Sequence, residues 1–175
     1  EALLNSLYQR GLLGANLRLI VMDGSAGLRA AAELVYPEAK IQRCWVHKLR
    51  NVANRCPKKH HACVRQARSI YLAANRPQAY AAFQRWKQAW RTRCPKAVAC
   101  LERDLEEMLN FFDCPVAHRI KVRTTNAIER SFREVRRRTN VFSCFSNPAS
   151  TERIIYAIFT HLNHGWKDSP LSGFT

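Results

Sequence analysis

The chain has 175 residues, and its 29 lysines and arginines outnumber its 13 aspartates and glutamates, which gives a net charge of +16. Its hydrophobic content of 47% excludes a disordered chain. A membrane-spanning protein is excluded as well, because no apolar run approaches the ~20 residues that cross a bilayer, and we expect no signal peptide. The positive charge therefore indicates a protein that meets nucleic-acid phosphates.

The start of the chain has the pattern of an α/β unit. Residues 1–10 carry leucines at helical spacing, and the run from Leu17 to Met22 is typical of a strand buried on both faces of a sheet. Residues 28–36 have one apolar helical face that stops at a proline, and residues 40–46 have the composition of a second strand. A strand, a helix and a strand in so few residues predict a βαβ unit with parallel strands.

The pattern is helical from Lys48 to about Ile120, and we interpret this block as an all-helical insertion into the α/β unit. Trp86 and Trp90 lie one helical turn apart, which favours a place in the core of the insertion. A platform that stacks on unpaired bases is the alternative.

Two further helices are predicted at the end of the chain. They cover residues 124–139 and 151–163, and a loop from Phe142 to Pro148 separates them.

Asp23 stands out because acidic residues are scarce and because it ends the first predicted strand. No acid lies between Glu38 and Glu102. A carboxylate at the carboxyl end of a central parallel strand lies where open α/β sheets bind ligands, and it can hold a divalent cation there. Aspartate before Gly-Ser-x-Gly is also common in turns and helix caps, so a local role for Asp23 is the alternative.

Glu129 is the second acid of interest. The run from Asn126 to Glu129 resembles a capping box, which is again a local alternative. The surrounding helix favours a functional role, because Glu129 shares one face with Arg133, Arg136 and Arg137, whereas Ile128, Phe132 and Val135 are predicted to form a buried stripe.

Clustered carboxylates and arginines suit metal-dependent phosphodiester chemistry, so Asp23 and Glu129 are the predicted metal ligands. The arginines around Glu129 are predicted to hold the DNA backbone, unless they only solvate an exposed helix face. They are Arg123, Arg130, Arg133, Arg136, Arg137 and Arg138.

Cys44 and His47 form a C-x-x-H motif at the end of the second predicted strand. Together with Cys56, His60, His61 and Cys63 they could complete a zinc site, but the spacing matches no closed zinc pattern. We therefore favour a buried Cys44 thiol and a hydrogen-bonded His47 near the active centre. The seven cysteines are scattered and odd in number, so we expect free thiols in a reducing compartment.

Four segments, in this order, resemble one known family. They are Asp23-Gly24-Ser25-Ala26-Gly27-Leu28, Tyr36-Pro37-Glu38-Ala39, the run from Gln42 to Asn51, and the run from Thr124 to Arg138. Together they are similar to bacterial Mutator-type insertion-sequence transposases, and the resemblance covers nearly the whole chain.

The resemblance implies a ribonuclease H-like catalytic domain with a DDE triad that binds two Mg²⁺ ions, for which Mn²⁺ can substitute. Asp23 and Glu129 match the second and third acids, and Cys44 and His47 match a signature whose histidine supports the active site. Such an enzyme hydrolyses the phosphodiester at the end of its element and then joins the freed 3′ hydroxyl to target DNA.

The implied partners are the terminal repeats of the element, target DNA and further copies of the chain, at the nucleoid in the bacterial cytoplasm. Arg43, Lys48 and Arg50 lie in the third matching segment and are further expected DNA contacts.

The expected fold class is α/β, a partial ribonuclease H-like domain interrupted by an all-helical insertion. Residues 1–48 are the first part of the core, 49–120 the insertion and 121–175 the last part of the core. No residue here matches the first catalytic aspartate or the N-terminal strands of the family, so we expect the isolated chain to bind DNA without cleaving it. A sheet of two strands also predicts exposed apolar surface and self-association.

Two alternative functions stay open. One is a non-catalytic basic DNA-binding module, and the other is a ribonuclease H-like nuclease without strand transfer.

Overall fold

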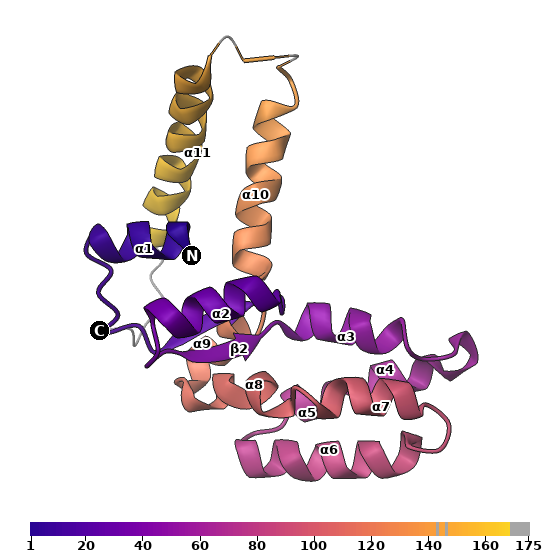
Figure 1. Cartoon of the computed structure of the whole chain (residues 1–175). Helices are drawn as coiled ribbons and strands as arrows, with labels where there is room; N and C mark the ends of the chain where they lie inside the picture. The colour runs from indigo at the N-terminus through magenta and orange to yellow at the C-terminus, as the bar shows by residue number, and fades with distance from the viewer. Residues whose placement is uncertain (143, 146, 169–175) are drawn as a thin grey trace. The chain divides into compact units, whose positions relative to one another are not determined.

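The computed structural model describes residues 1–142, 144–145 and 147–168 of the chain (Figure 1). It contains two compact units, of which Glu1–Thr125 is the first, and the second begins at Asn126. A short helix, α1 (Ala2–Gln9), opens the first unit, as the sequence predicts. In the part of the chain that the structure describes, no helix is both long and apolar enough to cross a membrane.

The two predicted strands form a parallel pair. They are β1 (Leu19–Met22) and β2 (Lys40–Arg43), and the crossover between them is α2 (Ala26–Val35). Their register places Met22 opposite Arg43, so both strands end at the same edge of the sheet. The prediction of a βαβ unit with parallel strands is confirmed.

β2 is shorter than the sequence predicts, because α3 (Trp45–Ala53) begins directly after Cys44. The indole of Trp45 is buried and donates a hydrogen bond of 2.8 Å to the Met108 carbonyl. Trp45 therefore belongs to the helical core, and the predicted strand from Lys40 to Val46 is wrong in its last residues. The C-x-x-H motif lies at the start of a helix instead of on a strand.

The middle of the chain is helical, as predicted. Its elements are α3, η1 (Lys58–His60), α4 (His61–Gln66), α5 (Arg68–Tyr71), α6 (Arg76–Trp90), α7 (Pro95–Glu102), α8 (Leu105–Leu109), η2 (Asn110–Asp113) and α9 (Val116–Val122). Phe83, Trp86 and Trp90 of α6 are buried in one apolar cluster with Leu101 and Met108. The two tryptophans therefore occupy the core, as the sequence favours, and are not exposed for stacking on bases.

The second unit contains the two predicted helices, α10 (Asn126–Thr139) and α11 (Pro148–Asp168). Phe132 of α10 and Phe159 of α11 meet edge to face with ring centroids 6.4 Å apart. The predicted buried stripe is wrong, because Ile128 is 54% exposed and Phe132 is 48% exposed. Residues 143 and 146 of the predicted loop lie outside the described residues.

The helical block is docked on the sheet by buried polar side chains. Gln42 of β2 is fully buried; its amide nitrogen donates to the Met108 carbonyl at 3.1 Å, and its amide oxygen accepts from the Phe111 N–H at 2.7 Å. The Asn110 amide donates to the Ile41 carbonyl at 2.8 Å. α8 and η2 therefore bind β2 through the Gln42 side chain and the Ile41 carbonyl, which joins the helical block to the sheet.

An ion network reinforces this contact. Asp104, 8% exposed, binds the ammonium of Lys48 and the guanidinium of Arg43, and Arg43 also binds Glu107 at 2.7 Å. Burial raises the pKa of Asp104, but the hydrogen bond and charge of Lys48, together with the charges of Arg43 and Arg103, lower it below its ordinary value overall.

We predict that Asp104→Asn lowers the free energy of unfolding by about 3 kcal/mol, because it leaves the buried Lys48 ammonium without its carboxylate. The lowered pKa of Asp104 means that its contribution is complete above the ordinary aspartate pKa and is lost as the pH falls below it. Urea unfolding across the acidic pH range measures both effects.

The matched control is Asp113→Asn, which removes a more exposed carboxylate that pairs with Lys40 and Arg76. It should cost about 1 kcal/mol or less. Equal losses for the two variants would contradict a dominant role for the buried pair.

Candidate functional site

Asp23 follows directly on β1, at the edge where both strands end. Its Oδ1 accepts a hydrogen bond of 3.1 Å from the Ser25 N–H, and the Ser25 hydroxyl in turn accepts from the Leu28 N–H at 3.4 Å. Ser25 is therefore the residue that caps α2, and Asp23 forms the turn before it. The turn bond uses one carboxylate oxygen, and the side chain of Asp23 is exposed.

Arg43 lies under the Asp23 turn. Gly24 has a φ of +105°, and a Cβ on it would lie 3.0 Å from Nη1 of Arg43. The guanidinium is held there by Asp104 and Glu107. The close approach and the positive φ both require glycine at position 24. The backbone after Asp23 therefore packs directly against the Arg43 guanidinium.

Cys44 closes the same edge of the sheet. It is buried, and its N–H donates to the Met22 carbonyl at 2.8 Å. Its sulfur accepts hydrogen bonds of 3.3 Å from both the N–H and the hydroxyl of Thr125. His47 lies in the first turn of α3, and its ring nitrogen and the Cys44 sulfur are within 4.8 Å of each other.

Glu129 lies in the first turn of α10, in the second unit. Its pairing with Asp23 stays a prediction, because the two residues belong to different units.

A basic groove of about 540 Å³ lies beside α3, α4 and α5. Three exposed arginines surround it, namely Arg50, Arg65 and Arg68. At its end the Arg68 guanidinium donates to the Tyr71 hydroxyl at 3.0 Å, and Arg123 stacks over the Tyr71 ring at 4.8 Å. Val46, Leu49, Ala53, His61 and Val64 complete the lining.

Of the cations expected to contact DNA, Arg43 and Lys48 are neutralised inside the first unit. Lys48 is 3% exposed, and its ammonium reaches only the buried Asp104 among the described carboxylates. The structure therefore argues against both as phosphate contacts. Arg50 is exposed and lines the groove, whereas Arg65, Arg68 and Tyr71 were missed by the sequence analysis. Their spacing of three residues along a short helical stretch was the available signal.

Comparison with known proteins identifies the family. The family model described as "Transposase, Mutator family" matches residues 1–169. The chain belongs to the Mutator family of transposases.

Three curated Mutator-family relatives illustrate the similarity. The transposase for insertion sequence element IST2 of Acidithiobacillus ferrooxidans is 44% identical over 138 residues, which cover 78% of this chain and 46% of the relative. The transposase for ISRM5 of Rhizobium meliloti is 37% identical, over 93% of this chain and 41% of the relative. The transposase for IS406 of Burkholderia multivorans is 38% identical, over 93% of this chain and 42% of the relative. The chain thus spans less than half the length of these relatives.

The arginines of α10 in this Mutator-family chain fall into two groups. Arg137 and Arg138 bind Glu134 in the same helix, and their hydrogen bonds and charges lower the pKa of Glu134 to about 2. Arg133 and Arg136 are exposed, and neither forms an ion pair within the described residues. Arg130 is also exposed and donates to the Asn126 carbonyl. Arg130, Arg133 and Arg136 are therefore the cations of this helix with charge available to an external anion.

We predict that Gly24→Ala lowers the free energy of unfolding by at least about 1 kcal/mol, because alanine is strained at this φ and its methyl group displaces Arg43. Chemical unfolding measures the loss. Gly27→Ala is the matched control: it lies in α2, has no atom within 4 Å of its new methyl group, and should be neutral or slightly stabilising. Similar effects of the two substitutions would show that the Asp23 turn needs no glycine.

Proposed function

We propose that this chain is the catalytic portion of an insertion-sequence transposase that hydrolyses the phosphodiester at element ends and joins the freed end to target DNA. The observation that carries the proposal is the exposed Asp23 carboxylate at the carboxyl end of a parallel strand, in a chain of the Mutator family. The fold that we propose for the intact domain is ribonuclease H-like.

The donor chemistry at Asp23 suits Mg²⁺ or Mn²⁺. Carboxylate oxygens are the ligands that these ions prefer, and the bond from Ser25 sets the orientation of the Asp23 carboxylate in advance. We assign Asp23 and Glu129 as two of the three carboxylates that hold two ions. Bound ions would activate the attacking oxygen and stabilise the leaving oxygen.

Arg43, which lies against the Asp23 turn, forms ion pairs with two acids, Asp104 and Glu107. Both carboxylates are therefore already bound to cations of the chain. They are therefore poor candidates for the third carboxylate. We propose that this carboxylate lies outside these 175 residues, so that the isolated chain binds DNA without cleaving it.

Cys44 has a positioning role in this proposal. Its buried sulfur accepts two hydrogen bonds from Thr125, the last residue of the first unit. What this role needs from Cys44 is hydrogen-bond acceptance at a buried position, and His47 follows Cys44 by three residues, about one helical turn.

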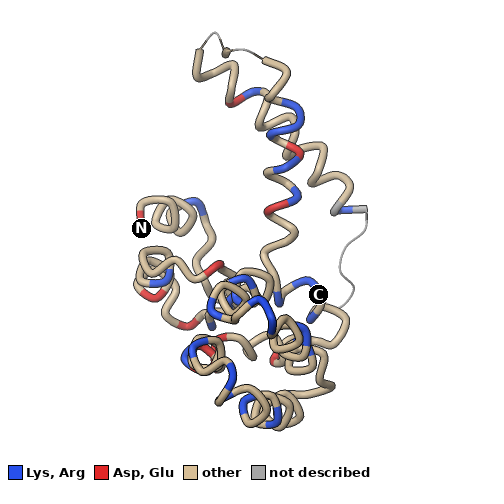
Figure 2. The backbone as a smooth tube through the Cα atoms, turned by 90° about the vertical axis from the view of Figure 1, so that its right-hand side faces the viewer, with Lys and Arg blue, Asp and Glu red and all other residues tan. Residues whose placement is uncertain are grey.

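DNA contacts are assigned to the groove arginines and to α10. Arg50, Arg65 and Arg68 line the groove in the first unit, and Arg123 stacks over the Tyr71 ring at its end. Arg130, Arg133 and Arg136 are exposed on α10, where basic residues recur along the helix (Figure 2). We propose DNA at element ends and targets as the partner, with a homo-oligomer forming on it.

A non-catalytic DNA-binding module is the second candidate, because the basic groove lies apart from Asp23 and needs no metal. The two functions differ in what the carboxylates do, and they predict different results for carboxylate variants.

For DNA binding, we predict that the double substitution Arg65→Ala and Arg68→Ala weakens binding to a short duplex. Each lost phosphate contact should reduce the slope of log affinity against log salt by about 0.9, hence by about 2 for the pair. Fluorescence anisotropy at several salt concentrations measures this slope. The double substitution Arg85→Ala and Arg91→Ala removes two exposed arginines outside the groove and is the control. Equal losses of DNA affinity and salt slope in the two double variants would show that the groove arginines contribute only through the general surface charge.

For the metal site, we predict that Asp23→Asn removes the enhancement of water-proton relaxation that Mn²⁺ shows when it binds the 175-residue chain, whereas Glu38→Gln, a substitution of another exposed acid, preserves this enhancement. Undiminished relaxation in Asp23→Asn would overturn the assignment of Asp23 as a ligand.

In a full-length Mutator-family transposase that carries these residues, Asp23→Asn and Glu129→Gln should abolish cleavage of element ends and leave DNA affinity nearly intact. Unchanged cleavage would leave only the binding module. Cleavage without joining in the unsubstituted protein would identify a nuclease of the same fold. Mg²⁺-dependent cleavage by the isolated 175-residue chain would contradict the proposal that the third carboxylate lies outside these residues.

A further inference from the structure

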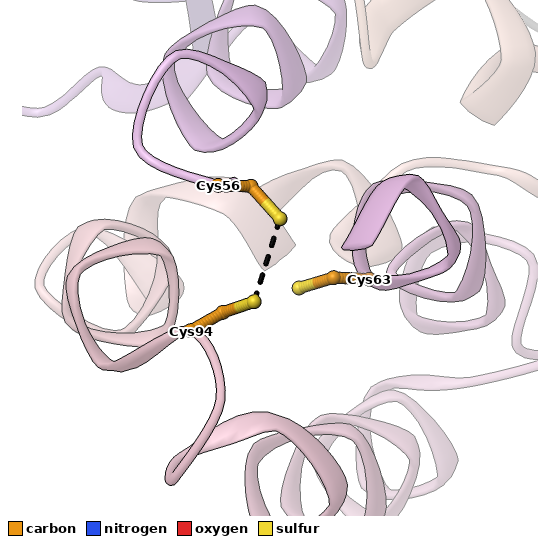
Figure 3. A group of neighbouring side chains, drawn as sticks. All are labelled: Cys56, Cys63 and Cys94. Atoms are coloured by element: carbon orange, nitrogen blue, oxygen red, sulfur yellow. Dashed lines mark hydrogen bonds between the residues drawn. The ribbon is translucent and has the colours of Figure 1, made fainter. Parts of the chain in front are cut away.

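Three cysteines that are separate in the sequence converge in the helical block (Figure 3). Cys56 lies in the loop after α3, Cys63 lies on α4, and Cys94 precedes the first residue of α7. Their sulfur atoms are all within 4.8 Å of one another, and those of Cys56 and Cys94 are 3.4 Å apart. Cys44 does not join them, because its sulfur binds Thr125.

We propose that Cys56, Cys63 and Cys94 form a three-thiolate site for a Zn²⁺ ion that ties α3, α4 and the α6–α7 connection together. None of its cysteines lies in the Asp23 turn or lines the basic groove, and nothing in the family comparison assigns the site.

The spacing of the sulfurs suits such an ion. Zinc–sulfur bonds of about 2.3 Å in a tetrahedral site place the sulfurs about 3.8 Å from one another, so the metal requires only small movements from the present positions. A disulfide would join two of these sulfurs and leave the third thiol buried beside it, whereas a metal ion engages all three.

The surroundings favour a metal ion over simple packing of thiols. Cys63 and Cys94 are fully buried, whereas Cys56 is half-buried and its thiol lies 3.4 Å from the Cys94 sulfur and 3.3 Å from the His60 carbonyl. A cation within reach of all three sulfurs is the partner that allows them to ionise together.

Charge balance points the same way. Zn²⁺ displaces three thiol protons, which are released to solvent, and the resulting centre carries one negative charge. Lys58 and Lys59 follow Cys56 closely in sequence, Arg93 directly precedes Cys94, and all three are exposed. The basic helical block therefore stabilises an anionic metal centre.

We assign the fourth position to the side of Cys56, because Cys56 is half-buried whereas Cys63 and Cys94 are fully buried. The His60 carbonyl accepts from the Cys56 thiol, and the His60 ring packs edge-on against Trp90 with centroids 5.9 Å apart, one helical turn before Cys94. Water or the imidazole of His60 completes the coordination there.

The test is zinc binding by the reduced, metal-free 175-residue chain, measured by competition with a chromophoric chelator. We expect one tightly bound Zn²⁺ per chain, a rise of several degrees in the melting temperature, and the absorption of a tetrahedral cobalt–thiolate centre when Co²⁺ replaces zinc. Zinc should protect Cys56, Cys63 and Cys94, but not the exposed Cys144, from alkylation detected by mass spectrometry.

Cys56→Ala is the informative variant, because Cys56 is only half-buried and its removal disturbs packing least. It should retain the circular dichroism spectrum of the metal-free chain and lose stoichiometric zinc binding. Cys100→Ala, which removes a buried thiol of the same block outside the cluster, should keep it. Absence of stoichiometric binding by the unsubstituted chain, or equal binding by Cys56→Ala, would overturn the proposal.

Discussion

The buried contact of Asp104 with Lys48 and Arg43 is the interaction on which the first unit depends. It joins the end of β2, the second turn of α3 and the start of α8 at one point. Arg43 and Lys48 carry two positive charges against the single negative charge of Asp104. Glu107 binds Arg43 and adds the second negative charge. Because Arg43 also supports the backbone at Gly24, the network reaches the turn that presents Asp23. The position of the proposed metal ligand thus depends on a contact buried inside the helical block.

The candidate site lies at the edge of the sheet where β1 and β2 end. Two strands of four residues end side by side, one followed by the exposed Asp23 and the other by the buried Cys44. The first side chain is available to a ligand, and the second fixes Thr125 through its sulfur. The division of roles follows from burial: a carboxylate must reach solvent to bind a hydrated cation, whereas a thiol that accepts backbone hydrogen bonds is most effective where water is absent.

Local pattern was sufficient to predict the βαβ unit, the helical block and the place of Asp23 at the end of β1, because strand length, helical periodicity and the Gly-Ser turn are encoded in adjacent residues. Tertiary contacts decided the rest. Residues 44–46 have strand-forming side chains, yet Trp45 binds Met108 and begins a helix. Lys48 appeared available to DNA because its carboxylate lies far along the chain, and Cys94 has no short spacing to Cys63. The ribonuclease H-like fold, the three-part division and the pairing of Asp23 with Glu129 stay predictions.

The neutralisation of Arg43 and Lys48 also shapes the electric field of the first unit. A net charge of +16 would repel a divalent cation from most of the surface of the chain. Around the Asp23 turn, however, the charges of Arg43 and Lys48 are cancelled by Asp104 and Glu107, and the unpaired arginines lie instead around the Tyr71 groove. The residues proposed to attract polyanions and those proposed to bind Mg²⁺ are thereby different. Under the proposed function, a protein this basic would hold a nucleic acid with its unpaired arginines and keep a region of balanced charge where a hydrated cation can approach a carboxylate.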